Sequence, residues 1–339
     1  MKQLTVIGIL IMALAASPVL GSEAVPKALI EGAKKEGKLV WWGTDGPPLA
    51  ATIITSFNRR YPFIKVEYTK GIGTDFGDRL MMEADAGASS VDVVNGADSF
   101  LNQLLERGVL KYVGDLPFMK LWPKGTVDPK GYWFGMNATN WILAYNNKLM
   151  SAAEAPKSYE EIINPKWKGQ FAIDERPDHW FLGLWIAWGK EKATVTLQKV
   201  LANKPYIGKG YTATAELLAA GQFKFALPMQ DYKIVQMRGQ KAPIDWVPLR
   251  PAEITFQGGH VMKKAPHPHT AELFLRWLTS KEGQLVYGKV TAKASLHPEL
   301  KAAAPLPMPK GLEVVYRTAE SYQLMPAVQE TYNRLVHGM

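Results

Sequence analysis

Cysteine is absent from the whole sequence of 339 residues. Its absence excludes a disulfide framework, a thiolate metal site and a lipid-modified N-terminal cysteine. The fold therefore depends on its hydrophobic core, and a chain of this length is expected to divide that core between two lobes. The sequence also lacks the G-x-S-x-G, H-E-x-x-H and G-x-G-x-x-G patterns of common enzyme sites, so it does not predict an enzyme.

Long apolar runs are missing after the first twenty or so residues of the chain. At the N-terminus, Lys2 precedes an apolar run over residues 4–16, and a Ser-Pro break and Gly21 follow. This is the pattern of a secretory signal peptide, and the run is shorter than the roughly 20 residues that cross a membrane. We expect residues 1–21 to be removed, which leaves a soluble protein that begins at Ser22 in a bacterial periplasm.

Clusters of basic residues are also missing, although the formal net charge is +9. The densest groups are pairs such as Lys34-Lys35 and Lys263-Lys264. Positive charge that is scattered in this way does not predict nucleic-acid binding, and it is a weak indication of an anionic ligand.

What the chain does contain is a regular alternation of helix-like and strand-like segments. Apolar residues recur at helical spacing in residues 25–37, and the apolar run 38–43 that follows ends in glycine. The alternation continues with helices expected at residues 48–61, 71–87 and 99–113, and strands at 63–69 and 91–97. This order predicts an α/β protein in which helices cover both faces of a mostly parallel sheet.

Two strand-like segments, residues 132–150 and 245–260, are placed so that each can cross from one lobe to the other. A second α/β set lies between them, and residues 269–289 have the apolar spacing of one amphipathic helix. A proline-rich stretch and a last helix complete the chain. We expect lobe 1 to comprise residues 22–136 and 250–300, lobe 2 residues 137–249, and residues 301–339 to form a linker and a helix that pack on the lobes.

Seven stretches between residues 38 and 290 are typical, in this order, of one protein family. They are KLVWWGTDG, SFNRRYPFIKVEY, GIGTDFGDRLMMEADAGASSVDVV, LLERGVLKYV, GYWFGMNATNWILAYNNKLM, SYEEIINPKWKGQFAID and GGHVMKKAPHPHTAELFLRWLTSKEGQ. In these stretches the chain resembles the iron-type branch of the extracellular solute-binding proteins, the periplasmic receptors of ABC importers. The resemblance implies a two-lobed periplasmic binding protein type II fold, with a mostly parallel sheet flanked by helices in each lobe and two crossing segments at the hinge. It also implies that the lobes close over a small solute and deliver it to a membrane permease, and we expect a monomer.

Ligands of open α/β sheets bind outside the carboxyl ends of the strands. Of the two tryptophans in the first strand, we expect Trp42 to lie nearer the cleft than Trp41. The helix expected to begin near Thr74 offers free backbone N–H groups to an anion, unless Thr74 serves only as its cap. The candidates for ligand contact in lobe 1 are Trp42, Thr44, Asp45, Gly73, Thr74 and Asn95.

Lobe 2 and the crossing segments contribute a second group of candidates. Arg176 can bind a carboxylate or phosphate through two hydrogen bonds, or else pair with a neighbouring acidic residue such as Asp174. Arg250 can contact a ligand or form a salt bridge at the hinge. The aromatic residues of this group either line the wall of the cleft or belong to the hydrophobic core. The candidates in this group are Asn140, Arg176, Trp180, Tyr211 and Arg250, with Asp178 and His179 nearby. Asn137 and Thr139, on the same crossing as Asn140, offer further hydrogen bonds or else form the polar face of a hinge strand.

For ferric-binding members, the resemblance implies two adjacent tyrosines from lobe 2, with a histidine and an acidic residue from lobe 1. The corresponding stretch here, LPMQDYKIVQ, has Asp231 and Tyr232 in place of the tyrosine pair. In lobe 1, Asp45 stands where the histidine is expected. Asp45, Asp231 and Tyr232 still form an oxygen-rich set of the kind that binds a hard cation such as Fe(III).

The sequence thus leaves two classes of ligand open. The favoured ligand is an organic or phosphorylated anion, held by the helix end at Thr74 and by Arg176, with no bound metal and no cofactor. The alternative is Fe(III) or a ferric chelate, bound by Asp45, Asp231 and Tyr232. A ligand sensor for a signalling partner and an enzyme built on the same fold are minor alternatives, and nucleic acid is not an expected partner.

Overall fold

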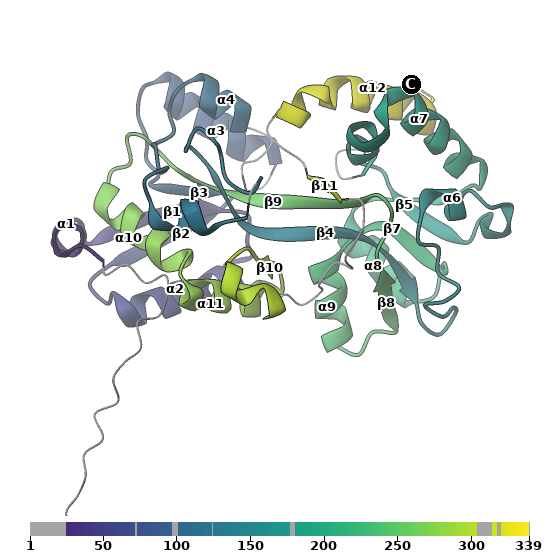
Figure 1. The fold of residues 1–339 in the computed structure, drawn as a ribbon, viewed down its shortest axis with the longest axis horizontal. Coiled ribbons are helices and arrows are strands. Elements are labelled where there is room, and N and C mark those ends of the chain that lie inside the picture. The colour runs from purple at the N-terminus through teal and green to yellow at the C-terminus, as the bar shows by residue number, and fades with distance from the viewer. Residues whose placement is uncertain are drawn as a thin grey trace, which may run out of the picture.

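Two groups of helices and strands lie side by side in the computed structural model, and two long strands run through both groups (Figure 1). The structure describes residues 25–71, 73–96, 101–123, 125–176, 180–303, 314–316 and 320–338. The expected signal peptide, residues 1–21, lies outside this part of the chain. Within the described part, no helix combines the length and the apolar character that crossing a membrane requires.

A single mixed sheet connects the two groups, with the strand order β2-β1-β3-β9-β4-β7-β5-β6. The strands at each end of the sheet are parallel to one another, as the alternating pattern predicts, and antiparallel pairs occur around the two long strands at its centre. The bounds are β1 Lys38–Gly43, β2 Lys65–Lys70, β3 Val93–Asn95, β5 Phe171–Asp174, β6 Tyr206–Gly208, β7 Phe225–Gln230 and β8 Ile244–Val247.

The two crossing segments are the long strands β4, Phe134–Asn146, and β9, Ala252–Val261. They pair with each other in antiparallel register, with Thr139 opposite Thr255. All 13 residues of β4 are buried, because helices or other strands cover it on both faces and along both edges. The expectation of two strand-like crossings is confirmed, and the two strands form one continuous hinge ribbon.

Helices cover the sheet at both ends, and we call the two ends lobe 1 and lobe 2. Lobe 1 is built from β1–β3 and the helices α1 Lys27–Glu36, α2 Pro47–Arg60, α3 Gly73–Asp85, α4 Leu101–Glu106, α5 Pro117–Leu121, α10 Pro268–Leu278 and α11 Lys281–Thr291. Lobe 2 is built from β5–β8 and the helices α6 Tyr159–Ile162, α7 Phe181–Ala202, α8 Tyr211–Ala219, α9 Asp231–Gly239 and α12 Met325–Val336. The exact domain boundaries expected from the sequence stay a prediction.

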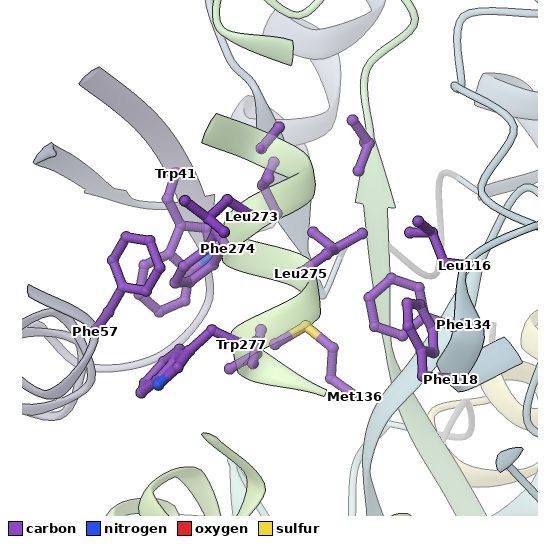
Figure 2. Close-up of a cluster of buried hydrophobic side chains, with 14 of the residues drawn as sticks. Trp41, Phe57, Leu116, Phe118, Phe134, Met136, Leu273, Phe274, Leu275 and Trp277 are labelled. Carbon is purple, nitrogen blue, oxygen red and sulfur yellow. The ribbon is translucent and has the colours of Figure 1, made fainter. Parts of the chain in front are cut away.

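Each lobe has its own aromatic core. In lobe 1, Trp41 of β1 packs against Phe274 of α10 with ring centroids 5.2 Å apart, and Phe57 of α2 meets the same ring at 5.1 Å. Figure 2 shows these rings beside Trp277, with Phe118 and Phe134 on the other side of α10. In lobe 2, a separate cluster gathers around Phe181 and includes residues of α12. Two cores agree with the two-lobed fold implied by the resemblance.

The segment expected to be one helix over residues 269–289 consists of two helices, α10 and α11. Ser280 separates them: its hydroxyl accepts a hydrogen bond from the Gly283 N–H at 3.2 Å and donates to the Trp277 carbonyl at 2.6 Å. A serine at this position is a strong N-cap, which favours a new helix start over continuation. The break directs α11 toward α2, where Glu282 pairs with Arg60 at 3.1 Å.

The C-terminal part, expected as a linker and a helix, also contains strand and 3-10 structure. A 3-10 turn spans Pro298–Ala303, and β11, Val314–Tyr316, extends the sheet beside β9. The helix α12 packs on α7, and the Tyr332 hydroxyl donates to the Asp174 carbonyl at 2.6 Å. The end of the described chain is therefore part of lobe 2.

Candidate functional site

Polar side chains from both lobes meet where β1, β3 and β7 end beside the hinge ribbon. We call this group the interlobe cluster. Hydrogen bonds join its members into one network around Asp45 on the lobe 1 side and another around Asp231 on the lobe 2 side. Lys293 lies between the two networks. Its members are Thr44, Asp45, Asn95, Asn137, Asn140, Asp231, Tyr232, Gln257, Tyr287 and Lys293.

Asp45 is the carboxylate of the cluster on the lobe 1 side. It follows β1 and is only 4% exposed. Its Oδ2 accepts hydrogen bonds from the Tyr287 hydroxyl at 2.6 Å and from Asn95 Nδ2 at 3.3 Å. The Tyr68 hydroxyl donates to the backbone carbonyl of Asp45 at 2.7 Å and holds the loop in place. A carboxylate with this many fixed donors is held in a single orientation.

The glycine that ends β1 has a packing role at this site. A Cβ atom at Gly43 would overlap the side-chain oxygen of Asn95. Asn95 Oδ1 in turn accepts from the indole N–H of Trp41 at 2.6 Å. The residue after the two tryptophans is thus small because the side chain of Asn95 lies against the backbone there.

Lys293 connects the two sides of the cluster. It follows α11 after Ala292, which turns the chain with a left-handed backbone, φ 58°. The Lys293 ammonium lies 3.2 Å from Asp45 Oδ1 and donates to Gln257 Oε1 at 2.6 Å. It also lies 5.5 Å from the centroid of the Tyr232 ring of lobe 2. A side chain of lobe 1 therefore reaches an aromatic ring of lobe 2 as a cation–π contact.

Gln257 of β9 is the hub of the network. Its Oε1 accepts from Lys293, from Asn137 Nδ2 at 2.8 Å and from the Tyr287 hydroxyl at 3.1 Å. Its Nε2 donates to the Thr44 hydroxyl at 2.9 Å. The side chain thus links the loop after β1 to both strands of the hinge ribbon.

Asp231 and Tyr232 form the lobe 2 side of the cluster. Asp231 begins α9 directly after β7 and is 1% exposed, and it accepts hydrogen bonds from Asn140 Nδ2 at 2.5 Å and from the Tyr232 N–H at 2.7 Å. Burial raises the pKa of Asp231 to about 6. Burial, together with the carboxylates of Asp45 and Asp231, raises the pKa of Tyr232 to about 12. The Tyr232 hydroxyl donates to Gln230 Oε1 at 2.8 Å.

The chemistry of the cluster is that of hard oxygen donors arranged around one ammonium group. Carboxylate, phenol and amide oxygens are the ligands that hard cations prefer, whereas the lysine offers a charge to an anion. Among the described residues, no group of three or more His, Cys, Asp or Glu side chains is placed to hold a metal ion. A cation bound here would use phenol and amide oxygens, or oxygens of its own chelator, in addition to the two carboxylates.

Seven of the residues named from the sequence belong to the interlobe cluster: Thr44, Asp45, Asn95, Asn137, Asn140, Asp231 and Tyr232. Trp42 is placed differently from our prediction. It is buried in a lobe 1 core cluster with Leu80 and Val94, and the guanidinium of Arg79 lies 4.3 Å from its ring. The tryptophan whose N–H reaches the cluster is Trp41, through Asn95.

Arg176 pairs with an acidic neighbour, which is the second of the two roles considered for it from the sequence. Its Nε lies 2.9 Å from Asp174 Oδ1, and its guanidinium lies 4.3 Å from the ring of Tyr211. Tyr211 packs against Trp141 of β4 at 5.0 Å, and the Trp141 N–H donates to the Thr255 hydroxyl at 3.0 Å. The side chain of Arg176 is 46% exposed, so it can still change partners when a ligand arrives.

The remaining predicted residues lie apart from these contacts. Trp180 is in the lobe 2 core, stacked parallel to Tyr159 and edge-on to Tyr332. Arg250 is exposed, and its backbone N–H donates to the Lys157 carbonyl at 2.9 Å. The helix α3 does begin at Gly73, as expected, but the burial and contacts of Gly73 and Thr74 lie outside the described part of the structure, as do Asp178 and His179.

Three members of the cluster were not predicted from the sequence: Gln257, Tyr287 and Lys293. Gln257 precedes two glycines in a strand, which is a detectable irregularity in an otherwise β-prone run. Tyr287 fits the apolar face of its helix and gives no separate signal. Lys293 is one of 40 basic residues, and only the turn after α11 brings it to Asp45, so local pattern could not identify it.

The His-Pro-His stretch at the start of α10 connects this helix to α1 and to the residue before β3. His267 Nδ1 lies 2.9 Å from Asp92 Oδ2, and His269 Nδ1 lies 2.6 Å from Glu36 Oε1. Asp92 also accepts from the Val40 and His267 N–H groups, each at 2.7 Å. The two histidines thus have separate carboxylate partners.

Comparison with known proteins finds relatives whose names refer to iron binding and iron uptake. The chain is 23% identical over 235 residues to the Fe(3+)-binding periplasmic protein of Serratia marcescens, which covers 65% of this chain and 68% of the relative. It is 26% identical over 239 residues to the iron uptake protein A1 of Synechocystis sp., which covers 65% of each chain. The chain thus aligns with about two thirds of the length of these relatives.

Solved structures with the same fold include iron-binding and other receptors. Iron-bound HitA of Pseudomonas aeruginosa matches with a TM-score of 0.73 and 19% identity, over 88% of this chain and 99% of that one. The Trichodesmium protein IdiA (FutA), in complex with iron and citrate ligands, has a TM-score of 0.72 and 19% identity over the same shares. The Atu4243–GABA receptor has a TM-score of 0.70 and 17% identity, over 88% of this chain and 97% of that one.

The family comparison covers most of the chain. Residues 52–310 match the family described as bacterial extracellular solute-binding protein. That range includes both strands of the hinge ribbon and every member of the interlobe cluster except Thr44 and Asp45. The two-lobed fold, the cluster between the lobes and this match agree: the chain belongs to the bacterial extracellular solute-binding proteins and, within them, resembles the ferric-binding receptors of ABC importers.

Proposed function

We propose that this protein captures ferric iron, carried by a small organic anion, between its two lobes. The observation that carries the proposal is the meeting of oxygen donors from both lobes at one position. Asp45 of lobe 1 and the Tyr232 ring of lobe 2 both lie beside the Lys293 ammonium. A ligand that touches groups of both lobes stabilises the closed state relative to the open one, which is how a binding protein retains its solute.

The donor set supports iron held with an anion better than a bare ion. Asp231 and Tyr232 replace the tyrosine pair that the resemblance implies, so the protein offers fewer phenolate ligands to Fe(III). Oxygen atoms of a carboxylate chelator can complete the coordination of a hard cation. The chelator brings negative charge, which Lys293 can neutralise. The names of the curated relatives, and the iron and citrate of the Trichodesmium structure, support the same class of ligand.

A metal-free organic anion, which the sequence favoured, is the second candidate. The position of Lys293 favours this candidate, because its ammonium already provides a positive charge where the lobes meet. The fold of the Atu4243–GABA receptor is compatible with an organic ligand as well. The iron-transport names of the curated relatives favour the ferric ligand over this candidate.

Calorimetric titration of the purified protein with ferric citrate, gallium citrate and citrate alone separates the two candidates. We expect ferric citrate and gallium citrate to bind and citrate alone to bind at least about tenfold more weakly, a difference of about 1.4 kcal/mol. Equal affinity for citrate with and without metal would assign the site to an organic anion. Turnover of the bound molecule during incubation would instead indicate an enzyme.

The phenol of Tyr232 gives this proposal a spectroscopic test. If Tyr232 ligates Fe(III), the loaded protein should show the visible absorption of an iron–phenolate pair, and Tyr232→Phe should lose it. Tyr112→Phe is a matched control, because Tyr112 is an exposed tyrosine of lobe 1 outside the interlobe cluster. Colour that persists in Tyr232→Phe would remove Tyr232 from the set of ligands.

Location and partners follow from the proposed role. A receptor of this family works outside the cytoplasmic membrane and hands its solute to an ABC permease, so export through the N-terminal signal is part of the proposal. A signalling partner would be the alternative receiver. Growth on limiting ferric citrate, with and without the gene, tests import directly.

A further inference from the structure

We infer that Lys293 is a built-in cation at the position that the proposed donor oxygens offer to a metal, so that a metal binds only when an accompanying anion takes over the ammonium. This inference rests on the proposed function for the identity of the solute. It assigns a specificity role to a residue outside the set that the family resemblance implies. The residue would make the site reject bare cations.

The surroundings of the ammonium support this assignment. Lys293 Nζ contacts Asp45 Oδ1 at 3.2 Å and Gln257 Oε1 at 2.6 Å, and it faces the Tyr232 ring at 5.5 Å. A carboxylate oxygen and an amide oxygen are ligands for a hard cation, and an aromatic face attracts any cation. The lysine therefore lies where the proposed donors of both lobes converge.

Charge balance explains why a cation is needed at this position. The Asp45 carboxylate is buried, and its contacts from Tyr287 and Asn95 come from neutral donors. In the described part of the chain, the ion pair of Asp45 is with Lys293. A buried carboxylate without a cation costs much more than a paired one, so Lys293 stabilises the site while it is empty.

The position of Lys293 in the chain allows the ammonium to withdraw. The residue lies in the turn between α11 and the short strand β10, Ala294–Ser295, rather than inside a helix. Its side chain is 13% exposed and ends a flexible four-carbon stem, so the charge can move several ångströms while the backbone stays in place. A chelator carboxylate would then pair with the displaced ammonium, while the metal takes the oxygens of Asp45 and Gln257.

The consequence is a coupling between cation and anion. A bare cation must compete with a tethered ammonium and leave that ammonium without a partner, whereas an anionic metal complex supplies the new partner itself. Removing the lysine charge should therefore have opposite effects on the two kinds of ligand. A merely structural role of Lys293 would weaken both.

The test compares Lys293→Met with the native protein, using terbium(III) chloride as a bare oxygen-seeking cation and ferric citrate as the anionic complex. Terbium luminescence, sensitised by nearby aromatic rings, reports the bare cation, and calorimetry reports ferric citrate. We expect Lys293→Met to bind terbium(III) about tenfold or more tightly, because a like charge a few ångströms away shifts such equilibria by one to three orders of magnitude. We expect the same variant to bind ferric citrate about tenfold or more weakly.

Two further variants control for charge and for folding. Lys289→Met removes an exposed lysine from the preceding helix, α11, and should behave as the native protein. Lys293→Gln keeps a hydrogen-bond donor near Asp45 without the charge, and it replaces Lys293→Met in every comparison if that variant does not fold. Lys293→Arg keeps the charge and should retain the preference for ferric citrate.

The outcomes separate this inference from the proposed function. If the native protein binds ferric citrate and Lys293→Met gains no terbium affinity, the role of Lys293 is overturned and the proposed function stands. If the native protein binds neither ligand but Lys293→Met binds terbium(III), Lys293 is confirmed as the blocking cation and ferric import is overturned. If neither protein binds either ligand, both ideas are overturned.

Discussion

Asp231 is an acid that the fold keeps almost entirely away from solvent. It is 1% exposed, and its carboxylate accepts hydrogen bonds from Asn140 and from the Tyr232 N–H. These bonds favour the charged form, but burial outweighs them and raises its pKa to about 6 from 3.8. At neutral pH the residue thus holds a charge at a cost to the free energy of folding, and a cation bound nearby would recover part of that cost.

The raised pKa predicts how the stability of the ligand-free protein depends on pH. Between about pH 4 and pH 6 the folded state keeps a proton on Asp231 that the unfolded state has lost, so this residue makes stability fall as pH rises. In Asp231→Asn this contribution is absent. The free energy of unfolding of the native protein, relative to Asp231→Asn, should therefore fall by about 3 kcal/mol across this range.

Denaturant unfolding of both proteins at several pH values measures that difference. Asp115→Asn, which changes an exposed carboxylate of lobe 1, should show no such trend. A difference between the native protein and Asp231→Asn that is constant from pH 4 to pH 7 would contradict the raised pKa.

At the scale of single elements, the break between α10 and α11 has a local cause. Ser280 caps α11 through the Gly283 N–H and closes α10 through the Trp277 carbonyl. The sequence on both sides of the break is compatible with a helix, and both helices have buried residues. Helical periodicity alone therefore predicts one helix, whereas the Ser280 cap ends α10 and begins α11.

Replacing this cap should lower the stability of the protein. We expect Ser280→Ala to reduce the free energy of unfolding by about 1 kcal/mol, because the N–H of Gly283 loses its side-chain acceptor. Thr55→Ala is the matched control: the Thr55 hydroxyl donates to a carbonyl of its own exposed helix face, so its loss should be nearly neutral. Chemical denaturation measures both, and equal effects for the two variants would argue against the cap.

Several elements could be predicted from the sequence because their signals are local. The strand β1 matches the expected residues 38–43, α1 and α2 lie within a few residues of their expected positions, and α12 is the helix expected within residues 301–339. The strand β11 was not predicted, because it depends on pairing with β9 across a long stretch of chain. Strands that are stabilised mainly by a distant partner leave little pattern of their own.

The candidate site was predictable to the extent that its residues lie at strand ends. Asp45, Asn95 and Asp231 follow or end β1, β3 and β7, where ligands of α/β sheets bind. Lys293 and Tyr287 come from the far end of the chain and reach Asp45 only through the packing of α11 on lobe 1. Their contribution is a property of the tertiary structure, so one sequence without its fold could not reveal it.

At the scale of the whole molecule, the arrangement predicts closure around the solute. Lobe 1 and lobe 2 have separate cores, and the polar side chains of the interlobe cluster lie between them. A solute that binds both sides should shift the population toward the closed form. We expect the radius of gyration from small-angle X-ray scattering to decrease when ferric citrate is added.

Citrate without metal is the control for this scattering experiment and should leave the radius of gyration unchanged. Measurement of the same samples by calorimetry shows whether the site is filled. A filled site with unchanged scattering would mean that the lobes do not move, and that the closed arrangement exists before binding.

The long strand β4 limits how this protein can be divided. Its 13 buried residues pair with β9 and β10 toward one end, and with β7 and β8 toward the other. A fragment that stops before Phe134 would lack β9 as well as β4 and would leave the edge of β3 without its neighbour, and a fragment that starts after Asn146 would leave the edges of β7 and β9 without β4. Unpaired edges of this kind invite aggregation. Neither half should be obtainable by itself in recombinant form, and chimeras with related receptors should join within surface loops instead of at the midpoint of the chain.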